Sequence, residues 1–529
     1  MGEPAIRLAE PGFVVLDTTI GGVLREAASR APQTVALVHG VPDAGARRRW
    51  TFAQLFGWAR GTASVLASEL APGERVALWA PTSPEALVLA HGAALAGLEL
   101  VLVNPALRSA EVAHVLGRSG AAALVMVEQW RDLDLAEVLA RVRDLLPELR
   151  TVRTLADVVA AGADADAADA PLPTVDPDDV ALIVFTSGTT GAPKGARLTH
   201  RAMTNSARVG AARFGIEPGD VYVNPMPLYH VGGHFVALEI LGNDATYVMV
   251  DAFDPALVID LMEQERATLT VAVPTMLVSL LEQEGIAQRD LGSLRAVSSG
   301  GAVVSADLVR RVRREFGAAV TVVFGQTECC GSTSQTRLDD APELVEETIG
   351  VPADGVDVRV VDPETDAVSE LDALGELQVR GYHVMAGYHD DPEATARTID
   401  ADGWLHTGDL VTLDADGFLR IVGRLKDMIV TGGVNVYAAE VETALESHPA
   451  VGQAAVLGLP DAHWGERVVA VLRPAAGATV DPVEIEAYLR ERLAPYKVPK
   501  QWEVVDDLPV TPYGKVRKFE LRETLVSGD

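Results

Sequence analysis

The sequence predicts an α/β protein with a large N-terminal domain of stacked α/β sheets, an antiparallel β subdomain and a small α+β C-terminal domain. The chain has 529 residues, more than the roughly 250–300 that one hydrophobic core supports, so at least two domains are expected. Up to about residue 350, short apolar runs alternate with segments of helical periodicity, and turn-rich β segments follow.

Buried strands are expected where short apolar runs end in turn residues or proline. Segments between them, such as 133–148, carry apolar residues at helical spacing, which favours largely parallel sheets with helical crossovers. The expected strands are 75–81, 98–105, 122–127, 180–186, 245–250 and 268–274. The Ala/Asp/Pro-rich stretch 161–179 is expected to be a surface connection that leads into the strand 180–186.

The pattern of the sequence changes from about residue 350. Short β segments separated by turn residues, such as GELQVRG (375–381), predict an antiparallel subdomain. After Arg424 a small α/β unit is expected, with helices near 438–447 and 482–492, strands near 451–457 and 467–472, and a last helix after Gly514. We therefore expect two domains, residues 1–423 and residues 424–529.

Charge and cysteine content exclude several classes of partner. The chain carries 44 Lys+Arg against 75 Asp+Glu, a formal charge of −31, so neither nucleic acid nor an anionic membrane is an expected partner. The longest apolar stretch, 85–105, is broken by His91 and Glu99 and is expected to be a buried helix and a strand rather than a membrane span. The two cysteines are adjacent and no secretory signal is visible, which favours the cytoplasm.

The stretch TSGTTGAPKGA, residues 186–196, is typical of a loop that binds phosphate. Glycines let backbone N–H groups converge on an anion, hydroxyl side chains add donors, and Lys194 supplies charge. Because Gly195 follows the lysine, the spacing departs from that of a P-loop NTPase. A flexible Gly/Thr linker is the alternative that this loop alone leaves open.

Seven segments together carry a closer resemblance. TSGTTGAPKGA is followed in order by PMPLYHVGG (225–233), SSGGA (298–302), FGQTE (324–328), GWLHTGDL (403–410), GRLKDMIVTGGVNVYAAEVE (423–442) and PVTPYGKVRK (509–518). In kind and order these motifs resemble those of the adenylate-forming superfamily, in its acyl-CoA synthetase branch. The resemblance implies that ATP and a carboxylic acid form an acyl-adenylate, which coenzyme A then cleaves to acyl-CoA and AMP.

The resemblance also implies roles for residues at the nucleotide. Glu328 would bind Mg²⁺, Thr327 the α-phosphate, Asp409 the ribose hydroxyls and Arg424 the ribose or phosphate. For Asp409 the local sequence leaves a turn or capping role equally open. The other residues expected at ATP or AMP are Thr186, Ser187, Gly188, Thr189, Thr190, Gly191, Lys194, Gly301, Ala302, Phe324, Gly325 and Gln326.

Residues of the C-terminal domain would act in turn as that domain moves. Lys515 resembles the lysine that bridges the carboxylate and the α-phosphate during adenylation, where a mobile ammonium offsets the repulsion of two anions. Lys426 resembles the hinge, and Gly432 and Gly433 would border the tunnel for the thiol of coenzyme A. Ala438 stands where many relatives have proline, a small departure at an expected helix start.

The segments that would surround the acid are apolar or small. The expected acyl pocket consists of Tyr229, His230, Val231, Gly232, Gly233, Phe235, Val273, Pro274, Thr275, Gly300 and Gly331. This lining favours a neutral hydrophobic acid, whether fatty, aryl, alicyclic or terpenoid. Amino-acid-activating relatives have an aspartate where Tyr229, His230 and Val231 stand here, so the resemblance disfavours an amino acid. His230 resembles a catalytic gate of the family, with a satisfied buried histidine as the alternative, and Cys329 and Cys330 are expected to line the pocket.

Three functions are compatible with these motifs. The first is an AMP-forming acyl-CoA ligase that uses ATP, Mg²⁺ and coenzyme A, alone or as a homodimer. The second is an enzyme that passes the acyl group to a carrier protein or partner enzyme. A non-catalytic nucleotide-binding module is the third, and Lys194, Glu328, Asp409, Arg424 and Lys515 argue against it.

Overall fold

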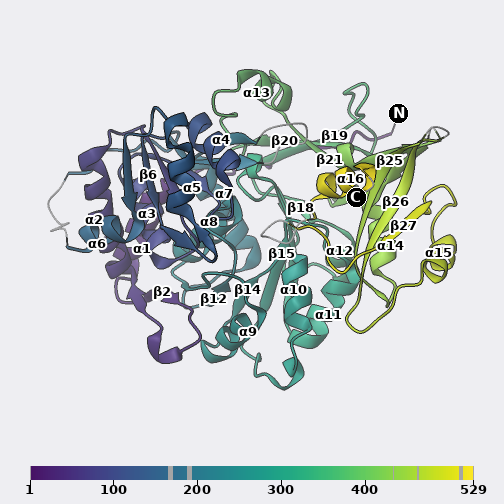
Figure 1. Ribbon diagram of the computed structural model, residues 1–529, viewed down its shortest axis with the longest axis horizontal. Coiled ribbons are helices and arrows are strands. Elements are labelled where there is room, and N and C mark those ends of the chain that lie inside the picture. The colour runs from purple at the N-terminus through teal and green to yellow at the C-terminus, as the bar shows by residue number, and fades with distance from the viewer. Residues whose placement is uncertain are drawn as a thin grey trace.

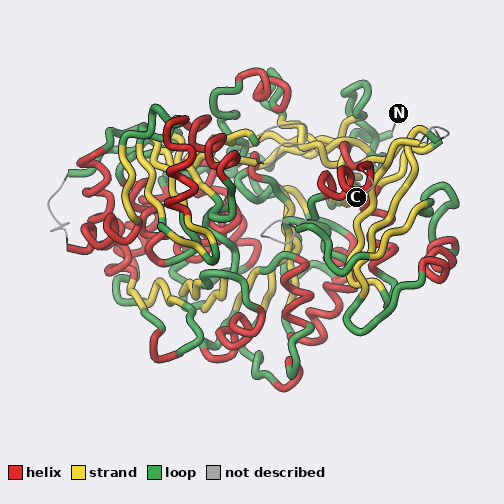
Figure 2. The backbone as a smooth tube through the Cα atoms, viewed as in Figure 1, coloured by secondary structure: helices red, strands yellow, loops and turns green. Residues whose placement is uncertain are grey.

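The computed structural model describes residues 2–164, 171–186, 193–432, 434–461, 464–510 and 516–527 (Figure 1). Figure 2 shows the strands of the N-terminal part gathered between helices, and the C-terminal strands at one side of the molecule. Among the described residues, none of the helices has the length and apolar character needed to cross a membrane. The architecture is the expected α/β class, with a large N-terminal lobe and a smaller C-terminal lobe.

The first large sheet has six strands in the order β11-β10-β5-β4-β6-β9, all parallel except β11. The strands are β4 (Arg75–Trp79), β5 (Glu99–Val103), β6 (Ala123–Met126), β9 (Thr151–Thr154), β10 (Val180–Thr186) and β11 (Lys194–Thr199). The intervening helices are α3 (Pro84–Leu95), α4 (Ser109–Ser119), α5 (Leu135–Val142) and α6 (Leu155–Asp164). The prediction of a surface connection over residues 161–179 is wrong at its start, because residues 161–164 form the last turn of α6.

The second large sheet has nine strands in the order β18-β17-β16-β15-β14-β12-β13-β2-β3. These are β2 (Val35–His39), β3 (Arg49–Thr51), β12 (Val221–Asn224), β13 (Thr246–Met249), β14 (Leu269–Val271), β15 (Ala296–Gly300), β16 (Ala319–Phe324), β17 (Ser334–Gln335) and β18 (Val351–Pro352). The run 268–274 is a strand only to Val271, because Pro274 begins a helix.

Helices pack on both large sheets. They are α1 (Ile20–Arg30), α2 (Phe52–Glu69), α7 (His200–Phe214), α8 (Val231–Gly242), α9 (Pro255–Gln264), α10 (Pro274–Leu281), α11 (Ala306–Phe316) and α12 (Pro342–Glu347). Strand alternation divides the six-stranded sheet: Val76 and Leu78 join the core shared with the nine-stranded sheet, whereas Ala77 and Trp79 pack under α4 and α5. A shared core therefore fixes the two sheets relative to each other.

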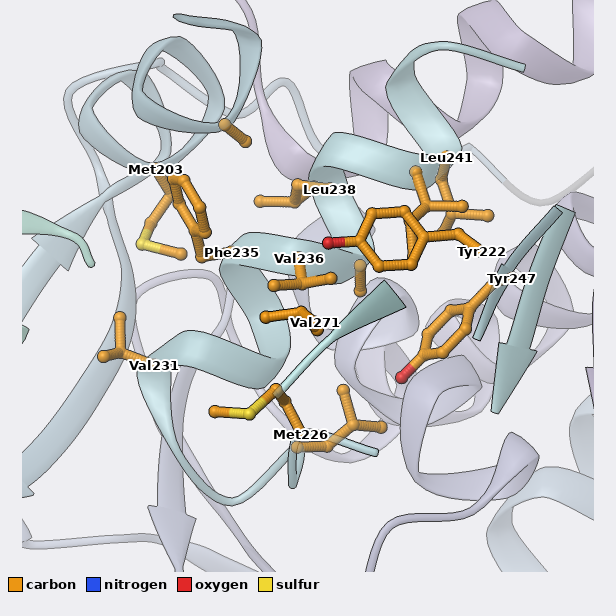
Figure 3. Packing of buried hydrophobic residues seen from close by; sticks show 14 of the residues in the cluster. Met203, Tyr222, Met226, Val231, Phe235, Val236, Leu238, Leu241, Tyr247 and Val271 are labelled. Carbon is orange, nitrogen blue, oxygen red and sulfur yellow. The ribbon is translucent and has the colours of Figure 1, made fainter. Parts of the chain in front are cut away.

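Helix α8 runs through this shared core. Its residues are almost all apolar, and every one from Gly233 to Leu241 is buried. A helix that is apolar on all sides is stable only when surrounded by protein. Figure 3 shows side chains of α8, including Phe235 and Leu238, packed among those of neighbouring elements. The helix begins at the PMPLYHVGG motif, so the core anchors one side of the candidate site.

The expected antiparallel subdomain is a five-stranded sheet in the order β1-β19-β20-β21-β22. Its strands are β1 (Ile6–Arg7), β19 (Val356–Val361), β20 (Gly375–Gly381), β21 (Leu405–Leu413) and β22 (Leu419–Arg424), and α13 (Pro392–Thr398) lies between β20 and β21. Residues 6 and 7 pair with Arg359 and Val358, so the N-terminus completes a sheet formed by distant sequence.

The C-terminal lobe begins where this sheet ends and has its own hydrophobic core. Its strands are β23 (Met428–Thr431), β24 (Val434–Tyr437), β25 (Val451–Asp461), β26 (Gly465–Pro474) and β27 (Gln501–Val504), and its helices are α14 (Ala438–Glu446), α15 (Pro482–Arg490) and α16 (Lys518–Ser527). Helix α14 contacts β22 of the large lobe. All the elements expected after Arg424 are present.

Candidate active site

Glu328 lies at the centre of the site, directly after β16 in a single 3₁₀ turn, Thr327–Cys329. Its Oε1 accepts a hydrogen bond from the Thr186 hydroxyl at 3.2 Å and another from the Tyr388 hydroxyl at 2.9 Å. Thr186 is the last residue of β10 in the other large sheet. One carboxylate therefore connects the loop that follows β10 to the loop that follows β16.

The groups around Glu328 fit Mg²⁺. Carboxylate and hydroxyl oxygens are the hard ligands that Mg²⁺ prefers, and it commonly takes one or two carboxylates together with substrate phosphates. Within the described parts of the chain, no cluster of three or more His, Cys, Asp or Glu side chains could hold a metal by itself. A Mg²⁺ ion at Glu328 would therefore share its coordination with nucleotide oxygens.

Lys194 contacts the ring of Tyr388, the residue whose hydroxyl donates to Glu328. This lysine begins β11, and its Nζ is 5.2 Å from the centroid of the Tyr388 ring. Tyr388 also forms a β-bridge with Ala196, two residues after Lys194. The ring and hydroxyl of one tyrosine thus bring the cation of the loop and the carboxylate of Glu328 into one neighbourhood. Ser187, Gly188, Thr189, Thr190 and Gly191 lie outside the described residues.

Asp409 and Arg424 form an ion pair on adjacent strands. They are opposite each other in the register of β21 and β22, and Arg424 Nε donates to Asp409 Oδ1 at 2.8 Å. The Asp409 side chain is 1% exposed, whereas that of Arg424 is 29% exposed. The Thr407 hydroxyl accepts a hydrogen bond from the Asp409 N–H. Strand register, rather than a flexible loop, positions this pair.

The segments expected to hold the adenine lie at the ends of neighbouring parallel strands. Gly301 and Ala302 follow β15 and are exposed, whereas Phe324, Gly325 and Gln326 at the end of β16 are partly buried. Gly301 has φ +76°, a conformation that residues with a Cβ rarely adopt. Thr327 is buried. Parallel strands place these segments along one edge of the sheet, beside Glu328.

The expected acyl-pocket residues come from three elements. His230 caps α8, and its Nδ1 accepts a hydrogen bond from the Gly232 N–H at 3.1 Å, so the neutral ring carries its proton on Nε2. Val231 and Phe235 are buried on α8, and Val273 is buried where Pro274 and Thr275 begin α10. Tyr229 is partly buried just before α8, Gly233 is packed against Pro227, and Gly300 lies at the end of β15.

Gly331 connects this pocket to the Glu328 turn. It has φ +93°, and a Cβ added to it would lie 3.4 Å from Cβ and Cγ of Phe235. Cys329 and Cys330 do not line the pocket as expected, because both are fully buried in the core. Burial raises the pKa of the Cys329 thiol to about 12, and it also raises the pKa of the Cys330 thiol well above its ordinary value. Neither thiol is a nucleophile at neutral pH.

The structure describes two of the four residues expected to act from the C-terminal domain. Lys426 is exposed in a 3₁₀ turn between β22 and β23. Gly432 has φ +58° at the tip of the β23–β24 hairpin, and its N–H donates to the Trp464 carbonyl at 2.7 Å. Gly433 and Lys515 lie outside the described residues, so their roles stay predictions.

Sequence reasoning missed Tyr388. It lies between β20 and α13, outside every motif, and it contacts both Lys194 and Glu328. Burial, followed by the charge of Glu328, raises the pKa of its hydroxyl well above the ordinary value of 10, so the hydroxyl remains a hydrogen-bond donor. The only available signal was an aromatic residue beside Gly387 in a segment between strands.

Comparison with known families agrees with this geometry. The family described as AMP-binding enzyme matches residues 24–389, and the AMP-binding enzyme C-terminal domain matches residues 440–515. A putative acyl-CoA synthetase of Bacillus subtilis, YngI, is 33% identical over 97% of this chain and 98% of its own length. The chain belongs to the AMP-binding enzyme family.

Further relatives and solved structures are similar along nearly the whole chain. A 3-[(3aS,4S,7aS)-7a-methyl-1,5-dioxo-octahydro-1H-inden-4-yl]propanoyl:CoA ligase of Rhodococcus jostii is 37% identical, over 96% of this chain and 98% of its own. ATP-bound MatB of Rhodopseudomonas palustris has a TM-score of 0.86 and 32% identity, over 96% of this chain and 99% of its own. Within its family the chain is an AMP-forming acid–thiol ligase of the acyl-CoA synthetase branch, with ATP, Mg²⁺ and coenzyme A as cosubstrates and cofactor.

Proposed function

We propose that this ligase activates a bulky hydrophobic carboxylic acid and that the residues described above carry out the two half-reactions. The observation that supports this most strongly is the convergence on Glu328 of Thr186 from one large sheet and Tyr388 from a third segment. Such an arrangement collects hydroxyl, carboxylate and ammonium groups at one edge, as a polyphosphate with a metal ion requires. The overall acidity of the chain makes this local supply of positive charge necessary.

In this proposal the nucleotide lies along the edge formed by the ends of β15, β16 and β10. Asp409 accepts hydrogen bonds from the ribose hydroxyls, and Arg424, held by Asp409, contacts ribose or phosphate. Thr186, Thr327 and Lys194 contact the phosphates, together with the loop residues between 186 and 194. Gly301, Ala302, Phe324, Gly325 and Gln326 surround the adenine. Mg²⁺ bound at Glu328 would neutralise phosphate charge.

Adenylation then needs the substrate carboxylate beside the α-phosphate. Both groups are anionic, so a cation between them lowers the barrier by electrostatic stabilisation. We assign this cation to Lys515. We place the His230 ring, whose Nδ1 accepts from the Gly232 N–H, at the mouth of the acyl pocket. No group has to remove a proton, since the acid reacts as a carboxylate.

For the second half-reaction we propose that the C-terminal lobe rotates about Lys426 as a unit, while Arg424 stays with β22 in the large lobe. The separate core of the C-terminal lobe supports movement as one body. The rotation would withdraw Lys515 and bring the Gly432–Gly433 turn to the adenylate, where the absence of side chains leaves room for the thiol of coenzyme A.

For the acid, the apolar walls from Val231, Phe235 and Val273 favour an aryl or alicyclic carboxylic acid. Relatives support this size class: one is named a feruloyl-CoA synthase, from Amycolatopsis, at 38% identity, and the Rhodococcus ligase is named for a bicyclic propanoyl group. A medium-chain fatty acid is the second candidate, because a macaque relative at 31% identity is named a medium-chain acyl-CoA ligase. Cytoplasmic location, a homodimer and transfer to a carrier protein stay predictions.

Acid-dependent exchange of pyrophosphate into ATP tests the proposal. Aryl and alicyclic propanoic acids should support exchange with higher kcat/KM than straight-chain acids of equal carbon number, and amino acids should support none. Product analysis with coenzyme A and with a phosphopantetheinylated carrier protein then identifies the acceptor. Exchange with none of the acids in the panel would contradict the proposed activity.

A further inference from the structure

The interior between α7 and α8 holds an acidic side chain that the mechanism above does not use. Glu239 lies on α8, one helical turn after Phe235, and is 4% exposed. Burial raises the pKa of its carboxyl well above the ordinary value of 4.5. Burial is the sole cause of this shift, so no cation or hydrogen-bond donor among the described residues offsets it. Burial therefore favours the protonated form of the Glu239 carboxyl, which has one O–H to donate.

The side chains of Glu239 and Phe235 both lie next to Gly210 of α7. A Cβ added to Gly210 would lie 2.4 Å from Glu239 Oε1 and 2.7 Å from Cζ of Phe235. The Cβ and Cγ atoms of the same phenylalanine lie next to Gly331, as described above. The Phe235 side chain thus spans the distance from the Glu328 turn, where the acid reacts, to the carboxyl of Glu239. Gly331 and Gly210, which have no side chains, lie at its two ends.

Two further polar groups lie near this end of Phe235. Tyr222 on β12 is fully buried, its hydroxyl has no hydrogen-bond partner in the described chain, and the Glu239 carboxyl contributes, after burial, to raising its pKa. Figure 3 shows the Tyr222 hydroxyl on the side of its ring that faces Leu238 and Phe235. Ser206 lies one turn before Gly210 on α7, and its hydroxyl is likewise buried without a partner within the described residues.

Buried polar groups without hydrogen-bond partners destabilise an apolar core. A buried donor without a partner costs about 1–3 kcal/mol, and nearly all buried polar groups in folded proteins are satisfied. Pockets for small molecules, in contrast, combine apolar walls with a few polar groups that await a ligand. Three such groups from α7, α8 and β12 surround the far end of a residue assigned to the acyl pocket.

We propose that Glu239, Tyr222 and Ser206 form a polar end to the acyl pocket, which binds a ketone or hydroxyl oxygen at the end of the acid remote from its carboxylate. This inference rests on the proposed function. The O–H groups of Glu239 and Tyr222 donate to the substrate oxygen, and Phe235 lies along the substrate between this end and Gly331. A hydrocarbon tail would leave the same groups unpaired, so the enzyme selects oxygenated alicyclic or aryl acids over their deoxygenated analogues.

Matched pairs of acids test the inference by pyrophosphate exchange. The probes are 3-(4-oxocyclohexyl)propanoate against 3-cyclohexylpropanoate, and the two corresponding butanoates, which extend the reach by one methylene. In the wild type, kcat/KM for at least one keto acid should exceed that of its partner about tenfold or more, because sites built to hydrogen-bond reject analogues that cannot. Tyr222→Phe and Glu239→Leu should each reduce this ratio about tenfold. Glu239→Gln, which still donates, should retain most of it.

Each outcome bears on the inference. Equal kcat/KM for keto and deoxygenated acids in the wild type would overturn it, as would equal losses for both acids in Tyr222→Phe and Glu239→Leu. Exchange with other hydrophobic acids but with neither keto acid would overturn it and leave the proposed function intact. Exchange with no acid at all would contradict the proposed function itself. Should Glu239→Leu fail to fold, Tyr222→Phe and Glu239→Gln, which preserve side-chain volume, decide the matter.

Discussion

The large and small lobes contribute to the site in different ways. In the large lobe, strand ends and strand register hold the groups for the nucleotide and the acid, as the Asp409–Arg424 pair and the Thr186–Glu328 hydrogen bond show. The small lobe has a core of its own, and in the proposed mechanism it contributes Lys515, Gly432 and Gly433. In this proposal the large lobe supplies the binding groups, whereas the small lobe determines the order of the two half-reactions.

Lys515→Ala should give the largest effect and should separate the lobes most clearly. Loss of the bridging cation should slow adenylation about 10²–10³-fold, the effect typical of removing one preorganised electrostatic group. Conversion of supplied acyl-adenylate to acyl-CoA should remain within about threefold of the wild type, since this step makes no use of an ammonium at the phosphate. Single-turnover measurements of both half-reactions check this, with Lys500→Ala, an exposed lysine of the same lobe, as the control. Equal loss in both steps would refute the assignment.

Gly433→Leu should produce the opposite pattern. If Gly433 borders the thiol tunnel as proposed, a side chain there would block the thiol, so thioester formation should fall about 10²-fold while pyrophosphate exchange is preserved. Val434→Leu, at an exposed position of the same hairpin, is the matched control and should affect neither reaction. A parallel loss of exchange would show that Gly433 supports folding rather than the tunnel.

Asp409→Asn tests the large lobe. The substitution keeps the shape but removes the charge that holds Arg424 and accepts from the ribose, and hydrogen bonds to charged groups contribute about 1.5–3 kcal/mol. We expect KM for ATP to rise about 10–100-fold, with KM for the acid nearly unchanged. Initial-rate kinetics with each substrate varied in turn check this. An unchanged KM for ATP would place the ribose elsewhere.

Buried ionisable groups predict a smaller contrast in the response of the two lobes to pH. Burial lowers the pKa of His91, His200 and His383 to about 4 and that of His234 to about 3, all in the large lobe. The unfolded chain takes up protons near pH 6.5 but the folded lobe does not, so stability should fall as pH decreases from 6.5 towards 4. Each unit of pKa shift corresponds to about 1.4 kcal/mol.

In the small lobe the sign is opposite. Burial raises the pKa of Glu446 to about 7, so the unfolded chain releases a proton above pH 4.5 that the folded lobe retains. Stability from this group is complete below pH 4.5 and is lost as pH rises to 7. Glu446→Gln can still accept the hydrogen bond from Ala454 and should stabilise the lobe slightly at pH 8 but not at pH 4.5, because Glu446 as a whole residue is exposed and solvent screens much of the effect. Denaturant unfolding at both pH values measures this difference, and equal effects at the two pH values would contradict the raised pKa of Glu446.

The sequence predicted most of the fold because its signals are local. Apolar runs such as 180–186 and helical periodicity such as 133–148 correspond to β10 and α5. Strand β1 could not be predicted, because it forms only by pairing with the distant strand β19. The Ala-rich start of 161–179 was also misassigned, since it continues α6 instead of forming a connection. Propensity alone does not show where a helix in an Ala-rich stretch ends.

The same distinction applies to the site. Motif residues such as Glu328 and Asp409 could be identified because each lies in a recognisable short pattern. Tyr388, Tyr222 and Glu239 could not, because their roles arise only when α8, β12 and the segment after β20 pack against other elements. Cys329 and Cys330 show the reverse error, since proximity to Glu328 in sequence suggested a pocket but the side chains point into the core.

A crystal structure with a non-hydrolysable analogue of the acyl-adenylate, such as an acyl-sulfamoyl adenosine, tests the central claim most directly. We predict the ribose hydroxyls within hydrogen-bond distance of Asp409, the adenine between Gly301 and Phe324, and the sulfamoyl group beside Thr186, Thr327 and Lys194. A ribose bound away from Asp409 and Arg424, or a sulfamoyl group remote from the loop after β10, would contradict the account.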